Sequence, residues 1–178
     1  MISPDDIEQA ATRIAPHVRE TPVMALERQA FGIPAVVTLK LELLQHTGSF
    51  KPRGAFNRIL SSQVPTAGVI AASGGNHGLA TAFAARSLGH RAEIFVPEIS
   101  SPVKIARLRG YGAAVNVGGA SYAEAFAASE ARVKETGALV VHAYDQPEVV
   151  AGQGTVGREF ERQAPKLDTI LVAVGGGR

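Results

Sequence analysis

Residues 68–96 read GVIAASGGNHGLATAFAARSLGHRAEIFV, and this stretch decides the fold class. A short apolar run leads through the glycine-rich SGGNHG into an alanine-rich segment that ends at Leu88, and a second apolar run follows at 91–96. Short apolar runs are typical of buried strands, and a glycine-rich turn often joins a strand to a helix. The stretch therefore predicts a strand, a helix and a parallel strand.

The same alternation extends in both directions from this stretch. Towards the C-terminus, helices are predicted at 102–109, 121–136 and 148–163, and strands at 113–117, 138–142 and 169–174. Towards the N-terminus, the patterns predict a helix over 3–18, a strand over 35–43 and a helix after Pro52. Strands that alternate with helices predict an α/β fold with a mostly parallel sheet.

The composition is that of an ordinary globular protein, with 178 residues, 46% hydrophobic and 19% charged. There is no cysteine, which excludes disulfides and thiolate chemistry. The N-terminus has no signal-peptide pattern and no apolar run is long enough for a membrane span, so we expect a cytoplasmic protein without membrane contact. Lys104, Arg107 and Arg109 predict a solvated helix face, because a nucleic-acid site would need a denser basic stripe with aromatic residues.

Lys51 opens a predicted helix directly after the turn Gly48-Ser49-Phe50. A helix N-terminus disfavours a positive charge, and burial would disfavour it further, which leaves a neutral and nucleophilic amine. A lysine that forms a Schiff base needs such an amine. Taken alone, the same residue also fits an exposed surface lysine.

Two glycine-rich loops follow predicted strands and could hold an anion. In the first, at 73–78, consecutive backbone N–H groups would face a ligand, and Asn76 could bind that ligand or cap the helix. The second is the triglycine 175–177, placed where parallel sheets bind ligands. The alternative for the first loop is a tight turn, and the alternative for the triglycine is an unstructured chain end. His77, taken alone, fits a histidine with a structural role. Gly152 and Gly154 lie inside a predicted helix and indicate close helix packing.

Five segments together resemble the serine/threonine dehydratases and serine racemases, which belong to the tryptophan-synthase-β-like pyridoxal-phosphate enzymes. They are KLE through SFKPRGA (40–55), SGGNHG (73–78), KIARLRGYGA (104–113), HAYDQPEVVAGQGT (142–155) and VAVGGG (172–177). The resemblance implies a three-layer, two-lobe α/β fold with a parallel sheet, of which this chain is the N-terminal part. Residues 68–145 would form the small lobe, and 1–67 with 146–178 would belong to the large cofactor-binding lobe.

The resemblance also implies pyridoxal 5'-phosphate as cofactor and a small hydroxy amino acid as substrate. L-threonine or L-serine would undergo α,β-elimination to a 2-oxo acid and ammonia. Lys51 would carry the cofactor and take the α-proton, Phe50 would pack near the cofactor ring, and Asn76 would bind its phenolic oxygen. The substrate carboxylate would be held by Ser73, Gly74, Gly75, Asn76 and His77. The phosphate would be held by Gly175, Gly176 and Gly177. A homodimer is implied, and the family's metal site would lie outside this chain.

Three positions depart from the family pattern. Gly74 stands where racemases carry a serine that acts as acid and base, and Tyr144 stands where dehydratases tend to carry an aromatic residue, so both favour elimination. Arg178 replaces a further glycine of the phosphate loop. The alternatives are a racemase or another β-eliminating or β-replacing enzyme of the same fold, an inactive truncated fragment, and a nucleotide-binding module without covalent chemistry.

Overall fold

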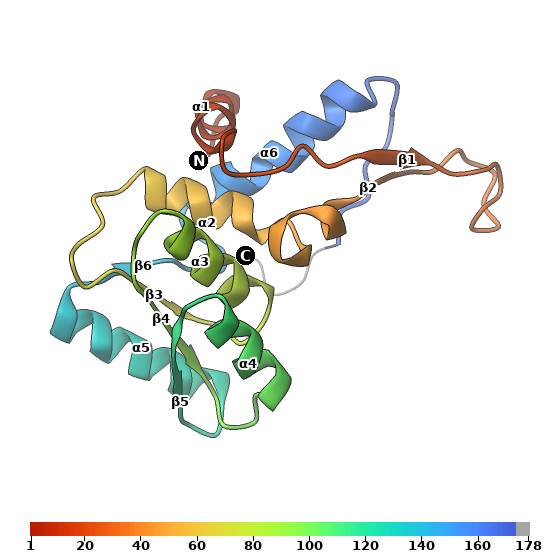
Figure 1. The fold of residues 1–178 in the computed structure, drawn as a ribbon. Coiled ribbons are helices and arrows are strands. Elements are labelled where there is room, and N and C mark those ends of the chain that lie inside the picture. Colours follow the sequence, from red (N-terminus) through yellow and green to blue (C-terminus); the bar gives the residue numbers. More distant parts are fainter. Residues whose placement is uncertain (174–178) are drawn as a thin grey trace.

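The computed structural model describes residues 1–173 (Figure 1). The first elements are α1 (Pro4–Ile14), β1 (Val23–Ala25), β2 (Thr38–Lys40), the 3-10 turns η1 (Glu42–Leu44) and η2 (His46–Gly48), and α2 (Lys51–Leu60). The middle elements are β3 (Val69–Ala72), α3 (Asn76–Ser87), β4 (Ala92–Val96), α4 (Pro102–Gly110) and β5 (Ala114–Val117). The last are α5 (Tyr122–Thr136), β6 (Leu139–Val140) and α6 (Pro147–Gln163).

Four strands form one parallel sheet in the order β5-β4-β3-β6. Ile70 of β3 lies opposite Glu93 on one side and Val140 on the other. After β3 the chain moves outward through β4 to β5, and it then returns through α5 to place β6 on the far side of β3. A separate antiparallel pair, β1 with β2, projects away from the helices (Figure 1). The predicted α/β fold with a mostly parallel sheet is confirmed.

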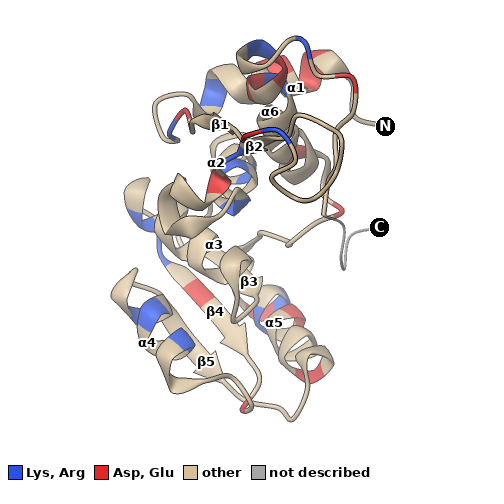
Figure 2. Ribbon diagram, turned by 90° about the vertical axis from the view of Figure 1, so that its right-hand side faces the viewer, with Lys and Arg blue, Asp and Glu red and all other residues tan. Residues whose placement is uncertain are grey.

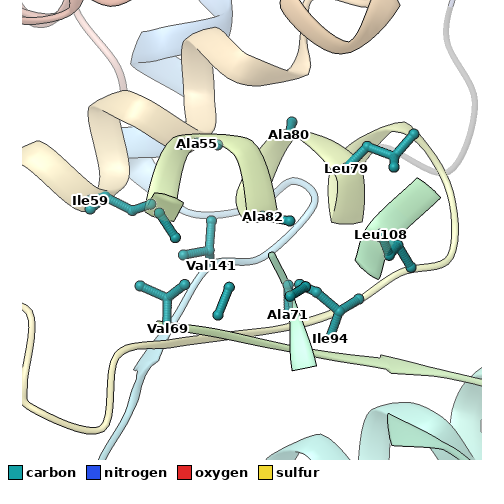
Figure 3. Close-up of a cluster of buried hydrophobic side chains, with 14 of the residues drawn as sticks. Ala55, Ile59, Val69, Ala71, Leu79, Ala80, Ala82, Ile94, Leu108 and Val141 are labelled. Carbon is teal, nitrogen blue, oxygen red and sulfur yellow. The ribbon is translucent and has the colours of Figure 1, made fainter. Parts of the chain in front are cut away.

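Helices cover both faces of this sheet. Helices α3 and α4 lie on one face and α5 lies on the other (Figure 1). Both faces need a cover because the strands carry apolar side chains on both sides, and all of β3 is buried. Helix α2 packs on α3, so the apolar core runs from the sheet through α3 to α2. Figure 3 shows this core, including Ile59 of α2, Leu79 of α3 and Ile94 of β4.

Helices α2 and α6 approach each other closely at glycines, as the sequence predicts. A Cβ atom on Gly152 would lie 2.6 Å from the carbonyl oxygen of Arg53 and 2.7 Å from the Cα atom of Gly54. A Cβ atom on Gly154 would lie 2.8 Å from the side chain of Ile7 in α1. Because the two nearest atoms that a Cβ atom on Gly152 would meet belong to the backbone of α2, glycine at this position lets α6 lie directly against the helix that begins with Lys51.

Two predicted elements are shorter than the sequence patterns suggest. Helix α1 begins after the cap at Ser3 but ends at Ile14 rather than at Val18, because Pro16 has no backbone N–H to continue the helix. The strand predicted at 35–43 is confined to β2, since Leu41 has the non-extended angles φ −87° and ψ 61° and η1 follows it directly. Strand β1 is too short to leave a periodic pattern.

The strand predicted at 169–174 is not found in residues 169–173, and Val174 lies outside the described residues. Ile170, Leu171 and Val172 are exposed, and neither sheet includes a strand from this segment. An extended segment becomes a strand only when a neighbour shares its backbone hydrogen bonds.

The basic residues of α4 form the solvated face that the sequence predicts. Lys104, Arg107 and Arg109 are all exposed, and Figure 2 shows basic segments on this helix. In the described part of the chain, none of the helices has the length and apolar character needed to cross a bilayer. The division into lobes at 68–145 stays a prediction, although the parallel sheet lies within that range.

Candidate active site

The strand order reverses beside β3, and the carboxyl ends of β3 and β6 lie on either side of that reversal. In open parallel sheets, ligands bind at such a switch point, beyond the carboxyl ends of the strands. The glycine-rich loop that begins at Ser73 follows β3, and the segment that begins at Val141 follows β6. The topology alone therefore indicates these two segments as parts of a binding site.

Lys51 reaches the segment after β6 from the first position of α2. Its Nζ atom donates a hydrogen bond of 2.8 Å to the carbonyl oxygen of Ala143, and it lies 5.0 Å from the centre of the Phe50 ring. Burial lowers the pKa of the Lys51 amine, because desolvation disfavours the charged form. The structure thus places a half-buried lysine with a lowered pKa at the switch point.

His77 reaches the same segment from α3. Its side chain is only 4% exposed, and its Nε2 atom lies 2.8 Å from the carbonyl oxygen of Val141. A carbonyl oxygen only accepts hydrogen bonds, so Nε2 carries the proton. Burial is the main reason that the pKa of His77 falls to about 4, and the ring is therefore neutral at neutral pH. A substrate would meet the backbone of His77 and not its ring.

The glycine-rich loop leaves the side chain of Asn76 open to a ligand. Ser73 Oγ accepts a hydrogen bond of 3.2 Å from the backbone N–H of Gly75, and a Cβ atom on Gly75 would meet only that hydroxyl, at 3.9 Å. Asn76 is exposed, and no hydrogen bond in the described residues uses its side chain, so it does not cap α3. The free N–H groups in the first turn of a helix favour an anion.

Two hydroxyl groups before Lys51 are further candidates that the sequence does not single out. Thr47 has φ 63°, a backbone conformation that β-branched residues rarely adopt. The hydroxyls of Thr47 and Ser49 are buried and have no hydrogen-bond partner among residues 1–173. Unpaired buried hydroxyls and strained backbone both cost free energy, and strained backbone gathers at functional sites. Serine and threonine are too common in turns for their identity alone to signal this.

A buried ion cluster anchors α2 behind Lys51. Arg53 is 1% exposed and pairs with Glu42 at 2.7 Å and with Glu159 at 3.0 Å. Lys40 pairs with Glu159 at 2.5 Å. Two positive and two negative side chains therefore join α2 to η1, β2 and α6. The cluster fixes the helix that presents Lys51 to the switch point.

A cavity of about 170 Å³ lies between α5 and the sheet, close to the end of β6. Its walls include Ile70, Phe126 and Val141. Lys51 does not line it, but Ala143 does, so the cavity adjoins the segment that binds the Lys51 amine. Within residues 1–173, no group of three acidic, histidine or cysteine side chains could hold a metal ion.

Residues 14–178 match the family model described as pyridoxal-phosphate dependent enzyme. The chain belongs to this family. As a pyridoxal-phosphate dependent enzyme, it has pyridoxal 5'-phosphate as its cofactor. The cofactor prediction is therefore confirmed, whereas the roles of individual site residues stay predictions.

Relatives within this family include dehydratases and racemases. The L-threonine ammonia-lyase of Geobacter sulfurreducens is 42% identical over 175 residues, which cover 96% of this chain and 43% of that protein. The structure of maize serine racemase matches with a TM-score of 0.89 and 34% identity, over 94% of this chain and 51% of its own. The structure of the T.th. threonine deaminase matches with a TM-score of 0.86 and 38% identity, over 94% of this chain and 54% of its own. The chain thus spans about half the length of these relatives.

These matches confirm the resemblance to the dehydratase and racemase group and the tryptophan-synthase-β-like fold. The residues present also fit the cofactor, because Lys51 offers an amine, and Thr47 and Ser49, four and two positions before it in the chain, carry buried hydroxyls that have no partner among residues 1–173. The predicted phosphate-binding residues Gly175, Gly176 and Gly177 lie outside the described residues. The sequence missed Ala143, because a backbone carbonyl has no side-chain signature.

Proposed function

We propose that the protein catalyses the α,β-elimination of L-threonine or L-serine to a 2-oxo acid and ammonia. The observation that carries the proposal is the half-buried Lys51 amine, with its lowered pKa, hydrogen-bonded at the switch point of the sheet. The names of the Geobacter relative and of the T.th. deaminase support the choice of reaction.

In this proposal, pyridoxal phosphate supplies an electron sink that spreads the charge left by loss of the α-proton. Lys51 would bind the cofactor covalently, and as a free amine it would take the α-proton. Its lowered pKa increases the neutral fraction that can accept a proton. Phe50 would pack near the cofactor ring, and Asn76 would bind its phenolic oxygen. The loop 73–77 holds the substrate carboxylate through backbone N–H groups at the start of α3.

The predicted glycines 175–177 would hold the cofactor phosphate. The α-proton and the β-hydroxyl would leave as the elements of one water, and a second water would then release ammonia and the 2-oxo acid. The predicted small lobe at 68–145 would move over the substrate. We also propose that the whole protein is a homodimer.

The structural similarity to maize serine racemase makes racemisation the second candidate. Gly74 has no hydroxyl that could donate a proton. A Cβ atom added to Gly74 would lie 3.2 Å from the hydroxyl oxygen of Ser100. A serine at this position would therefore be crowded by Ser100. Tyr144, after the end of β6, also fits the dehydratase pattern. Elimination is the function that these residues favour, and chiral analysis of the product separates 2-oxo acid from D-amino acid.

Trapping of the cofactor tests the role of Lys51. The chain is incubated with pyridoxal phosphate, reduced with borohydride and digested, and the peptides are weighed by mass spectrometry. We expect the mass of the reduced cofactor on the peptide that contains Lys51. In the Lys51→Ala variant we expect that this added mass is absent. Lys104→Ala, which removes an exposed lysine of α4, is the matched control and keeps the added mass. Equal labelling of the Lys51→Ala chain would show that another amine binds the cofactor.

Product analysis tests the reaction itself. We expect 2-oxo acid and ammonia in equal amounts from L-threonine or L-serine, and none from the Lys51→Ala chain. If the cofactor is attached to Lys51 and neither substrate yields a 2-oxo acid, elimination is wrong for this chain. A cofactor-binding fragment without activity would then account for the structure.

A further inference from the structure

The segment from Val141 to Gln146, called here the 141–146 turn, is held by side chains at several points. His77 binds the carbonyl oxygen of Val141 at 2.8 Å. Gln146 accepts a hydrogen bond of 2.8 Å from the backbone N–H of His142 and donates one of 3.3 Å to the carbonyl oxygen of Val140. The His142 ring also contacts the backbone of Tyr144. The backbone on both sides of Ala143 is therefore fixed.

The fixed turn leaves one carbonyl group, that of Ala143, facing the Lys51 amine at 2.8 Å. The Phe50 ring lies near the same amine. An amine donates hydrogen bonds to a carbonyl oxygen but keeps its lone pair when it is neutral. The contact can therefore hold the amine in place without using the electrons that react.

We propose that the 141–146 turn is a dock for the free Lys51 amine and that His77 is the positioning residue that aims the Ala143 carbonyl at it. The proposal rests on the proposed function only in taking Lys51 as the reacting amine. The dock would hold the amine whenever it is not bound to the cofactor, both before loading and after a substrate amine has displaced it.

The geometry of His77 gives this role a specific chemical requirement. The ring acts through the proton on Nε2, while Nδ1 is buried without a partner in the described residues. A glutamine side chain places its amide nitrogen at about the same reach as Nε2, so His77→Gln keeps a donor for Val141. Methionine has a similar length but no donor, so His77→Met removes the hydrogen bond with little change in volume.

The test measures the pKa of the Lys51 amine in the chain without cofactor. Competitive labelling with acetic anhydride over a pH series, read by peptide mass spectrometry, gives this pKa with exposed Lys104 as the internal reference. A carbonyl acceptor stabilises the protonated amine, so loss of the dock lowers the pKa. We expect His77→Met to lower it by about one pH unit, which is the size of one hydrogen bond to a charged donor.

Three further variants decide the interpretation. Gln146→Met releases the other end of the turn and is expected to lower the pKa in the same direction, which keeps the test valid if His77→Met does not fold. His77→Gln is expected to retain the wild-type pKa. His90→Met, a change at a partly exposed histidine that makes no hydrogen bond with the turn among residues 1–173, is the matched control and is expected to leave the pKa unchanged.

The proposal is overturned if both methionine variants of the turn leave the Lys51 pKa unchanged or raise it. It is also overturned if His77→Gln shifts the pKa as much as His77→Met, because packing and not the hydrogen bond would then be responsible. These measurements contain no cofactor. Failure of the borohydride trapping on Lys51 would therefore contradict the proposed function but not the proposal that the turn holds the Lys51 amine.

Discussion

The guanidinium of Arg53 and the carboxylate of Glu159 form a bidentate ion pair across 106 residues of sequence, with both N–O distances at 3.0 Å. Although burial raises it, the pKa of Glu159 is held below its usual value by hydrogen bonds from Arg53 and Lys40. Arg53 is almost fully removed from water, so the carboxylates of Glu159 and Glu42 are needed to compensate its positive charge. The pair joins the helix that carries Lys51 to α6.

Glu159→Gln is expected to destabilise the fold by about 3 to 5 kcal/mol, because it leaves the buried charge of Arg53 only partly compensated. Urea unfolding followed by circular dichroism measures the change. Glu161→Gln removes an exposed carboxylate from the same helix and is expected to change stability by no more than about 0.5 kcal/mol. If the two variants unfold at the same urea concentration, the ion pair does not stabilise α6 against α2.

His77 makes the stability of the fold depend on pH. Its pKa in the folded chain is about 4, against 6.5 for an ordinary histidine. Below pH 6.5 the unfolded chain therefore binds a proton that the folded chain does not, and stability falls as the pH falls. Between pH 7 and pH 5 this one group is expected to cost about 2 kcal/mol of stability. Urea unfolding at several pH values measures the loss.

His77→Gln identifies the group responsible, because glutamine does not titrate. We expect this variant to lose about 2 kcal/mol less than the wild type over the same pH range. His90→Gln keeps His77 and is expected to retain the full loss. The range stays above the usual pKa of Glu159, so protonation of that carboxylate contributes little. An identical loss in His77→Gln and wild type would show that other groups cause the pH dependence.

The sequence predicts the parts of this fold that depend on local patterns. The run of strands and helices between 68 and 163 and the helix that starts at Lys51 follow from apolar spacing and from turn residues, and the structure contains them. Even the glycines inside α6 indicate their packing role, because glycine in a helix needs a reason.

Local sequence patterns do not predict contacts between residues that are distant in the chain. The bond from Lys51 to Ala143 joins residues 92 positions apart, and its acceptor is a backbone atom that every residue has. Arg53 and Glu42 look like surface residues in the sequence, and only the fold shows that they are paired and largely buried. The strand predicted at 169–174 failed for the same reason, since pairing depends on a neighbour and not on the apolar run itself.

The strained turn before Lys51 is expected to lower stability in the chain without cofactor. Thr47→Gly removes both the unfavourable φ of 63° and the unpaired buried hydroxyl. Glycine also raises the entropy of the unfolded chain, which offsets part of this gain. We therefore expect the free energy of unfolding, measured with urea, to rise by about 1 kcal/mol. Thr38→Gly, the same change in the extended strand β2, relieves no strain and is expected to destabilise. A loss of stability in Thr47→Gly would show that the turn is not strained.

Gly152 is expected to be the least tolerant glycine of α6. A methyl group there would lie 2.6 Å from the carbonyl oxygen of Arg53 and 2.7 Å from the Cα atom of Gly54, so α6 would have to move away from α2. We expect Gly152→Ala to destabilise the fold by about 1 to 3 kcal/mol in urea unfolding. Gly157→Ala lies in the same helix with nothing within 4 Å of the new methyl group, and its better helix propensity is expected to stabilise by up to about 1 kcal/mol. Because the two substitutions are chemically identical, only the contact with α2 can give them opposite signs, and equal effects would contradict the close approach of these helices.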